Sequence, residues 1–451
     1  MRKQMSPQTL RAFKMSLPIF VELLLQLLVG NVDQIMLSHF SQASVAAVGN
    51  GNQVMTVVII VLDAMSAATT ILMTQYIGAK KEDAYGRVCV AGLIIVGVFS
   101  LAAGALLVCF PGALFTLLRT PQDAFAQAVL YTRVVGGAVV IQGMYFVFCA
   151  ALRSFSLLRE VMLSAIVMNV VNICGNAILI NGLFGAPRLG VLGAAISTDL
   201  SKLLGLCLVL GVFHKKCDIR LNVGMLRPFP KDMAGKILSI AMPSGVESLS
   251  YNVSQIFILR FINVMGTTVI ATKVYASIFA NVAYVYTIAI SQATQILIGY
   301  LLGAGRREEV DGRVWSTTRI ALLIGELLTL LIFLFADPLY SIFTPDPAIH
   351  ALGRQIILVE FALEIGRAVN IVMVRSLTAA GDVWYPVIVG ILFQWAVAVC
   401  GSYLLGNAAG LGLVGIWIAM AADECFRAVL FLFRFRHGDW RKKHLIDEPG
   451  S

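Results

Sequence analysis

Acidic and amide side chains occur within stretches of this sequence that are otherwise apolar. Asp33 follows Asn31 in one such stretch, and no lysine or arginine lies near it in the sequence. A charge at mid-bilayer costs roughly 2.5–3.5 kcal/mol on insertion scales, so an acid kept there usually has a function. We expect Asp33 to bind H⁺ or Na⁺. The alternative is a carboxylate at a helix end that reaches the outer interface.

Three asparagines repeat at helical spacing further along the chain. Asn169, Asn172 and Asn176 stand at i, i+3 and i+7, so they share one stripe of a helix. Because an amide is costly in lipid, we expect this stripe to face the protein interior. It can serve either as hydrogen-bonding contact between helices or as a set of oxygen ligands. Thr198 and Asp199 add a hydroxyl and a second carboxylate to the same half.

Two glutamates follow prolines by one helical turn. Glu247 comes after Pro243, and its counterpart Glu22 comes after Pro18. Proline breaks the helical hydrogen-bond ladder and frees a carbonyl nearby. Glu247 is therefore a candidate proton carrier or cation ligand, and Glu22 is a weaker one. The alternative for both is a structural kink with an acid that reaches toward the interface.

A charged arc occurs in a later apolar stretch. Glu364, Arg367 and Asn370 stand at i, i+3 and i+6. The glutamate and arginine are either a salt bridge that keeps both charges in the membrane or a switch, in which protonation of Glu364 releases Arg367. Tyr251 either lines an amphipathic pocket or lies at an interface. A further set of charged residues is predicted to be structural: Asp63, Glu326, Glu360, Asp423, Glu424 and Arg427.

Motifs for enzymatic or ATP-driven chemistry do not occur in the sequence. It has no Walker A sequence, HExxH or nucleophile elbow. The eight cysteines show no paired spacing, so we expect no disulfide framework and no metal site beyond a transient Na⁺. We expect neither an enzyme nor a resident cofactor. Any uphill transport must then draw on an ion gradient, with H⁺ or Na⁺ as the coupling ion.

Composition predicts that helices in a membrane position these residues. Of the 451 residues 59% are hydrophobic and 13% are charged, whereas soluble domains carry about 25% charged residues. Spanning a bilayer core takes roughly 20 apolar residues as helix, and lipid-exposed backbone must satisfy its own hydrogen bonds. We predict an all-α membrane protein with twelve transmembrane helices at 13–38, 46–77, 87–118, 124–151, 160–182, 190–213, 236–264, 268–302, 313–335, 349–377, 383–405 and 411–436.

The basic residues predict the orientation of these helices. The net charge is +9, but the lysines and arginines lie in short loops and tails without a nucleic-acid-binding motif. They concentrate in the N-terminal tail, in alternate loops and in the C-terminal tail. The opposite loops carry little more than Arg119, Arg188 and Arg354. The positive-inside rule then places both termini in the cytoplasm, which requires an even number of spans.

The sequence also contains an internal repeat. Its two copies match at an offset of 243 − 18 = 225, beginning with Pro18-Ile-Phe-Val-Glu22 and Pro243-Ser-Gly-Val-Glu247. Two later matches follow at the same offset: Ser66-Ala-Ala-Thr-Thr-Ile-Leu72 with Ser291-Gln-Ala-Thr-Gln-Ile-Leu297, and Gly78-Ala79 with Gly303-Ala304. A fourth match, Gly190-Val-Leu-Gly193 with Gly412-Leu-Val-Gly415, has an offset of 412 − 190 = 222. Six helices per copy predict two parallel repeats, namely an N-lobe (1–213), a cytoplasmic linker (214–235) and a C-lobe (236–451).

Taken in order, these motifs resemble the multidrug and toxic compound extrusion (MATE) family over nearly the whole chain. The motifs that carry the resemblance are Val32-Asp33, Val45-Ala-Ala-Val-Gly49, Gly78-Ala79, Gly190-Val-Leu-Gly-Ala-Ala195, Pro243-Ser-Gly-Val-Glu247, Gly303-Ala304-Gly305 and Ala380-Gly381-Asp382. The resemblance implies two six-helix lobes around a central cavity. It also implies a bacterial inner-membrane antiporter, which we expect to be monomeric, that exchanges H⁺ or Na⁺ for small cationic, amphipathic compounds.

The resemblance also implies site residues and shows departures. An N-lobe cation site of the family corresponds to Asp33, Asn172, Asn176 and Thr198, but Asn176 stands where the family often has aspartate. Another branch uses a glutamate that matches Glu247, with Glu364 the nearest candidate for its second acid. The loop Arg153-Ser-Phe-Ser departs from the family's usual pattern. The alternative function is a lipid-linked precursor flippase of the same superfamily.

Overall fold

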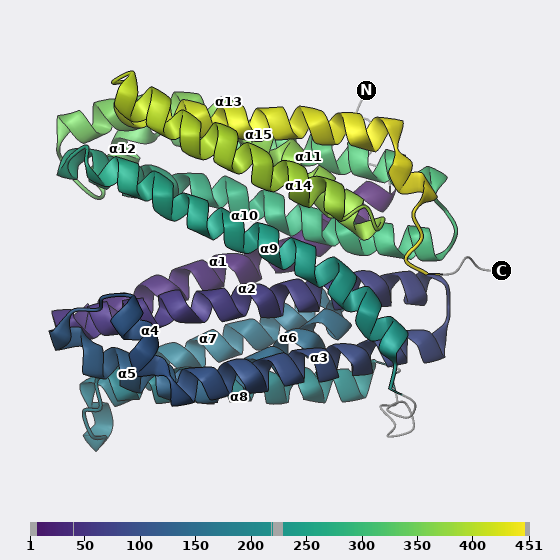
Figure 1. Cartoon of the computed structure of the whole chain (residues 1–451), viewed down its shortest axis with the longest axis horizontal. Coiled ribbons are helices and arrows are strands. Elements are labelled where there is room, and N and C mark those ends of the chain that lie inside the picture. Colours follow the sequence, from purple (N-terminus) through teal and green to yellow (C-terminus); the bar gives the residue numbers. More distant parts are fainter. Residues whose placement is uncertain (1–6, 39, 218, 220–228, 447–451) are drawn as a thin grey trace. The chain divides into compact units, whose positions relative to one another are not determined.

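The computed structural model describes residues 7–38, 40–217, 219 and 229–446, without the side chains of residues 7–9, 29–31 and 33. Every regular element in this part of the chain is a helix (Figure 1). The predicted all-α class is therefore confirmed. The chain divides into two compact units. Unit 1 comprises Met1–Phe20 with Val246–Ser451, and unit 2 comprises Val21–Gly245.

Unit 2 is a bundle built around two long helices. α2 packs against α3, α5 and α6, and α8 packs against α5, α6 and α7. Its elements after α1 are α2 (Gln42–Gly78), α3 (Glu82–Cys109), α4 (Pro111–Leu117), α5 (Gln122–Gly137), α6 (Val139–Ser154), α7 (Leu158–Asn181), η1 (Leu183–Gly185) and α8 (Val191–Lys216).

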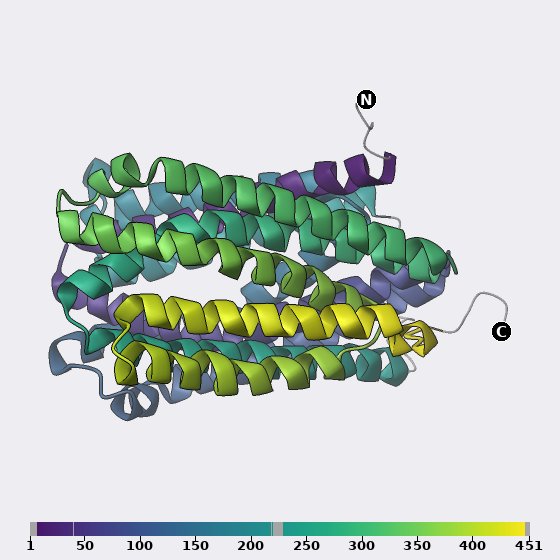
Figure 2. The same cartoon turned by 90° about the horizontal axis from the view of Figure 1, so that it is seen from above.

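Unit 1 is a bundle around α13, which packs against α10, α11, α14 and α15. Figure 2 shows α15 running alongside α14 and its continuation, which it also contacts. The elements of unit 1 after α9 are α10 (Thr267–Gly303), α11 (Glu308–Leu334), α12 (Ala336–Ser341), α13 (Pro347–Ala379), α14 (Trp384–Phe393), the π-helical turns η3 (Gln394–Val399) and η4 (Ser402–Ala408), α15 (Gly412–His437) and η5 (Asp439–Lys442).

The two helices that contain the repeated prolines are shared between the units. α1 (Pro7–Ser38) contains Pro18, and α9 (Lys231–Asn263) contains Pro243. The unit boundaries fall after Phe20 in α1 and after Gly245 in α9, which is two residues past each proline. In each half of the repeat, the first helix therefore begins in one unit and ends in the other, and the boundary lies at equivalent positions. The predicted lobe limits, 1–213 and 236–451, describe repeats rather than packing units and stay a prediction.

The predicted spans correspond to the observed helices, with three interruptions. The 124–151 span is the pair α5 and α6, bent by 45°. The 87–118 span includes the short α4 after α3, and the 383–405 span continues from α14 through two π-helical turns. Among the described helices, seven are long and apolar enough to cross a membrane, or eight if the bent pair is one span. The count of twelve spans therefore stays a prediction.

Backbone geometry repeats with the sequence. A Cβ on Gly193 would lie 2.5 Å from the Leu179 carbonyl oxygen, and one on Gly415 would lie 2.6 Å from the Leu405 carbonyl oxygen. These two glycines end the fourth repeated motif, and each lets the start of a helix approach the end of the preceding one. Lys80 and Gly305 also occupy equivalent turns, both with positive φ (56° and 73°). The repeat is thus present in the structure as well as in the sequence.

Candidate functional site

The predicted N-half site is partly assembled by α7 and α8. Asn172 Nδ2 donates to Thr198 Oγ1 at 3.4 Å, and Asn176 Nδ2 donates to Asn172 Oδ1 at 3.5 Å. The two helices lie close together here, because a Cβ on Gly175 would meet Ser197 Oγ at 2.4 Å. The structure therefore brings together three of the predicted residues in one hydrogen-bonded chain.

The other predicted residues of this half differ in how they are placed. Asn169 is buried on the same stripe of α7, and its Nδ2 has no hydrogen-bond partner among the described residues. Asp199 Oδ1 is also buried without such a partner. Asp33 and Asn31 belong to α1, but their side chains lie outside the described part of the chain. Whether Asp33 completes the chain of Asn172, Asn176 and Thr198 stays a prediction.

Glu22 forms an ion pair. The carboxylate is almost fully buried, and Arg153 Nη2 donates to its Oε1 at 2.7 Å. Arg153 belongs to the last turn of α6, whereas the sequence analysis placed it in a loop. Glu22 is therefore a buried acid whose charge is neutralised within unit 2, rather than an acid that reaches the interface, and its role in cation binding stays a prediction.

Glu364 and Arg367 contact each other on α13, as their spacing predicts. Arg367 Nη1 lies 3.0 Å from Glu364 Oε2 and 2.9 Å from Glu360 Oε1. Trp417 Nε1 donates to the other oxygen of Glu360 at 2.7 Å, and Thr287 Oγ1 donates to Glu364 Oε1 at 3.2 Å. One arginine thus holds two buried glutamates, and each glutamate has a further donor. This arrangement is a closed salt-bridge network, which supports the structural alternative in the state described.

A second charged network joins α13 to α15. Arg427 donates to Asp423 through Nε at 3.1 Å and through Nη2, and Nη2 also lies 3.0 Å from Glu424 Oε1. Asn370 Nδ2 donates to Glu424 Oε2. The close approach of the helices depends on Gly366, where a Cβ would lie 2.6 Å from the backbone nitrogen of Cys425. Asn370 is therefore part of this network rather than of the Glu364–Arg367 pair.

A cavity of about 430 Å³ opens beside the second network, within unit 1. Predicted residues that line it are Glu247, Tyr251 and Asn370. Its remaining walls come from α9, α10, α13, α14 and α15: Ser248, Asn252, Tyr284, Ile288, Ile371, Val374, Arg375, Pro386, Gly390, Glu424, Arg427 and Phe431. A mixture of tyrosines, aliphatic side chains and a few charges is typical of a small-molecule pocket.

Glu247 is the charged residue of this cavity that the sequence singled out. It has no ion pair or hydrogen bond among the described residues. Gly390 of α14 lies against it, since a Cβ there would be 3.5 Å from the Glu247 carboxylate oxygen. Glu364 does not line the cavity. The structure thus separates Glu247 from the second acid that the family resemblance suggested.

Arg375, Glu424 and Arg427 are cavity residues that the sequence analysis did not assign to a site. Glu424 and Arg427 were predicted to be structural, and their mutual ion pair fits that prediction, although both also face the cavity. Arg375 was not singled out at all. The available signal was a basic residue inside the predicted 349–377 span, where an arginine is costly in lipid.

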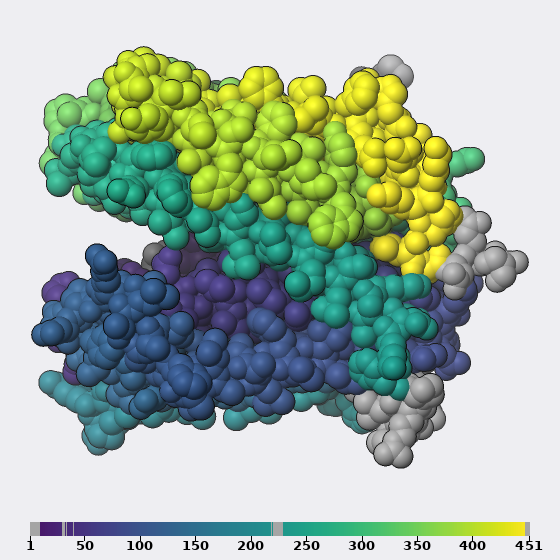
Figure 3. Space-filling model, viewed as in Figure 1, coloured from purple at the N-terminus to yellow at the C-terminus, as the bar shows by residue number. Residues whose placement is uncertain are grey.

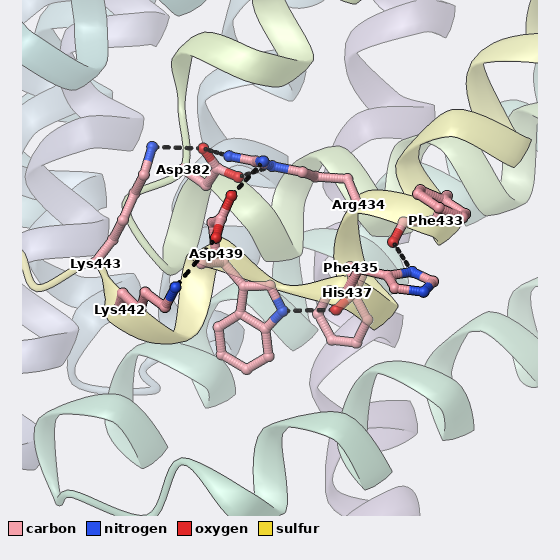
Figure 4. A network of polar contacts seen from close by, with 9 residues as sticks. Asp382, Phe433, Arg434, Phe435, His437, Asp439, Lys442 and Lys443 are labelled. Carbon is pink, nitrogen blue, oxygen red and sulfur yellow. Dashed lines mark hydrogen bonds and ion pairs between the residues drawn. The ribbon is translucent and has the colours of Figure 1, made fainter.

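A further polar network fixes the chain after α15 (Figure 4). Asp382 is fully buried and accepts hydrogen bonds from Arg434 Nε at 2.8 Å and Lys443 Nζ at 2.7 Å. Trp440 is buried and stacks on Phe435. Arg307 donates to the carbonyl oxygens of Arg441 and Lys443. These contacts hold residues 438–446 against unit 1, and the same residues belong to the yellow surface in Figure 3.

Comparison with known proteins agrees with this arrangement of helices and cavity. The MatE family model matches residues 18–178 and 243–404, one match in each half of the repeat. The chain belongs to the MatE family of membrane transporters.

Two curated bacterial relatives align over nearly their whole length. An uncharacterized transporter, YisQ of Bacillus subtilis, is 33% identical over 441 residues, which cover 98% of this chain and 97% of that protein. A probable multidrug resistance protein, NorM of Thermotoga maritima, is 28% identical over 445 residues, with 96% and 93% covered.

Solved structures show the same fold. A crystal structure of MATE in the bent conformation superimposes with a TM-score of 0.87 at 21% identity, covering 97% of this chain and 99% of that one. The solved structure thus shares the all-helical fold of this chain, and the protein is a multi-pass membrane transporter of this family.

Proposed function

We propose that this transporter is a secondary active antiporter that exports small cationic or amphipathic compounds in exchange for H⁺ or Na⁺. The observation that supports this proposal most directly is the environment of Glu247. Glu247 is an acid on α9, the helix that contains Pro243, it lines a cavity of about 430 Å³, and it makes no ion pair or hydrogen bond with a described residue. An unpaired acid inside a membrane bundle is expensive and is expected to bind a cation.

Two further features support the coupling role. The Asn172–Asn176–Thr198 chain supplies amide and hydroxyl oxygens, which suit Na⁺ or a hydrogen-bonded proton site. The three side chains of this chain are neutral, so we propose that Asp33 on α1 supplies the negative charge of the cation site. The proposal thus has one acid per repeat, with Asp33 in the first half and Glu247 in the second. It places the protein in the bacterial cytoplasmic membrane, with both termini in the cytoplasm, and it requires no catalytic residue or cofactor.

The test is efflux from proteoliposomes, driven separately by a pH jump and by a sodium jump, with a panel of organic cations. Asp33→Asn and Glu247→Gln should each abolish or strongly reduce efflux, while Asp337→Asn should not. Asp337 forms an exposed pair with Arg354 outside the cavity, so it is a matched acid control. Wild-type rates in both Asp33→Asn and Glu247→Gln would reject the assignment.

The alternative function is that of a lipid-linked precursor flippase, and the charges of the cavity argue against it. A pyrophosphate headgroup needs several unneutralised basic side chains in the cavity. Arg427 is already paired with Asp423 and Glu424, which leaves Arg375 as the cavity arginine without an ion pair among the described residues. We therefore expect small cationic or amphipathic compounds rather than a lipid pyrophosphate to be transported.

A further inference from the structure

The charges that line the cavity of unit 1 differ in whether they are neutralised. Arg427 and Glu424 pair with each other, and Asp423 and Asn370 add further bonds. Glu247 and the Arg375 guanidinium have no ion pair or hydrogen bond among the described residues. The cavity therefore offers a ligand one negative and one positive side chain, and neither makes a direct ion pair with a described residue.

The first half of the repeat shows the contrasting case. At the offset of 225, Glu22 corresponds to Glu247 and Arg153 corresponds to Thr378. Equivalent turns support this alignment, since Ser156 and Gly381 both have positive φ at the same offset. Glu22 and Arg153 form an ion pair in which Arg153 Nη2 lies 2.7 Å from Glu22 Oε1. In the second half the arginine stands one helical turn earlier, at Arg375, and the pair is not formed.

Glu247 and Arg375 are both partly buried, and a charged group in such a place is stabilised by a ligand group of the opposite sign. A ligand with both signs of charge would do so within one cavity, and a purely cationic ligand would leave Arg375 unsatisfied. Tyr251 and Tyr284 supply apolar ring surface in the same walls. From these observations we propose that the cavity binds zwitterionic amphiphiles, with the ligand's ammonium toward Glu247 and its carboxylate toward Arg375. This inference rests on the proposed export function and narrows its substrate class.

A matched set of fluorescent probes tests the proposal. Nα-Dansyl-lysine is a zwitterion, its methyl ester is a cation, and its Nε-acetyl derivative is an anion, while the aromatic group is the same in all three. Binding to the full chain in detergent is followed by dansyl fluorescence. The wild type should bind the zwitterion about tenfold more tightly than either singly charged probe, because each charge-assisted hydrogen bond adds on the order of 1.5–3 kcal/mol.

Substitutions at Arg375 and Glu247 should separate the contributions of the two charges to binding. Arg375→Gln should weaken binding of the zwitterion and of the anion about tenfold and leave the affinity for the methyl ester within about twofold. Arg375→Lys should restore part of the loss. Glu247→Gln should weaken binding of the zwitterion and of the methyl ester and leave the affinity for the anion unchanged. Arg354→Gln removes an arginine whose partner is Asp337, outside the cavity, and should change none of the three affinities.

Three results would decide against the inference. Equal losses for all three probes in Arg375→Gln would indicate that Arg375 acts through packing or gating. A wild type that prefers the methyl ester would indicate a purely cationic substrate class. Coupled export of the ester without any preference for the zwitterion would refute this inference and leave the antiporter proposal standing. Failure of every probe and organic cation to be exported would refute the antiporter proposal instead.

Discussion

Asp382 and Arg434, 52 positions apart, form an ion pair in which Arg434 Nε lies 2.8 Å from Asp382 Oδ2. Asp382 follows α13, Arg434 stands in the last turn of α15, and Lys443 comes from the chain beyond it. Three segments of unit 1 are therefore joined at one fully buried carboxylate. This connection makes the segment after α15 a structural part of the unit.

We expect Asp382→Asn to destabilise the protein by about 2 kcal/mol, because it weakens charge-assisted hydrogen bonds to a buried acceptor. The thermal unfolding temperature in detergent should fall, and trypsin should cut after Lys442 or Lys443 sooner than in the wild type. Asp337→Asn, which removes a pair with both side chains at least half exposed, should change neither quantity measurably. Unchanged trypsin sensitivity in Asp382→Asn would contradict the role of this pair.

The same carboxylate predicts a dependence on pH. Burial raises the pKa of Asp382, but hydrogen bonds from Arg434 and Lys443 outweigh this effect and hold the pKa below its usual value. The unfolded pKa is about 3.9, so the contribution of Asp382 to stability is complete above roughly pH 5 and is lost as pH falls through the folded pKa. Unfolding temperatures from pH 7 to pH 3 should fall more steeply in the wild type than in Asp382→Asn. Parallel curves would contradict this prediction.

Glu22→Gln should lower stability by about 2–3 kcal/mol, because it leaves the largely buried Arg153 without its counter-charge. Replacing both side chains with glutamine should cost less than the sum of the two single changes, which a double-mutant cycle of unfolding temperatures would measure. Glu160→Gln breaks a more exposed pair with Lys216 and should cost at most about 1 kcal/mol. Additive effects of Glu22→Gln and Arg153→Gln would show that the contact is not energetically coupled.

Gly193→Ala and Gly415→Ala should each destabilise the protein by about 1–3 kcal/mol, because the added methyl group would press on a backbone carbonyl. Gly211→Ala in the same helix as Gly193 has nothing within 4 Å of the new Cβ and should be neutral or slightly stabilising. Thermal unfolding of the three variants is the measurement. Similar unfolding temperatures for Gly193→Ala and Gly211→Ala would mean that α8 can shift without cost.

The sequence by itself determined the helical class, the approximate limits of the helices and the internal repeat. Long apolar runs leave a membrane-spanning chain few options other than helix, and the offset of 225 between equivalent motifs can be read without coordinates. Local spacing also predicted contacts within one helix. The Glu364–Arg367 pair is an example, since residues at i and i+3 lie on one face.

Tertiary structure alone decided which charges are neutralised. Glu22 and Glu247 have the same sequence context after a proline, yet one meets Arg153 from α6 and the other faces a cavity. Arg375 belongs to that cavity only because α9, α13 and α15 bring their side chains to one place. Contacts between residues far apart in the chain depend on how helices pack, and a one-turn displacement of an arginine is enough to open an ion pair that the repeat would otherwise form.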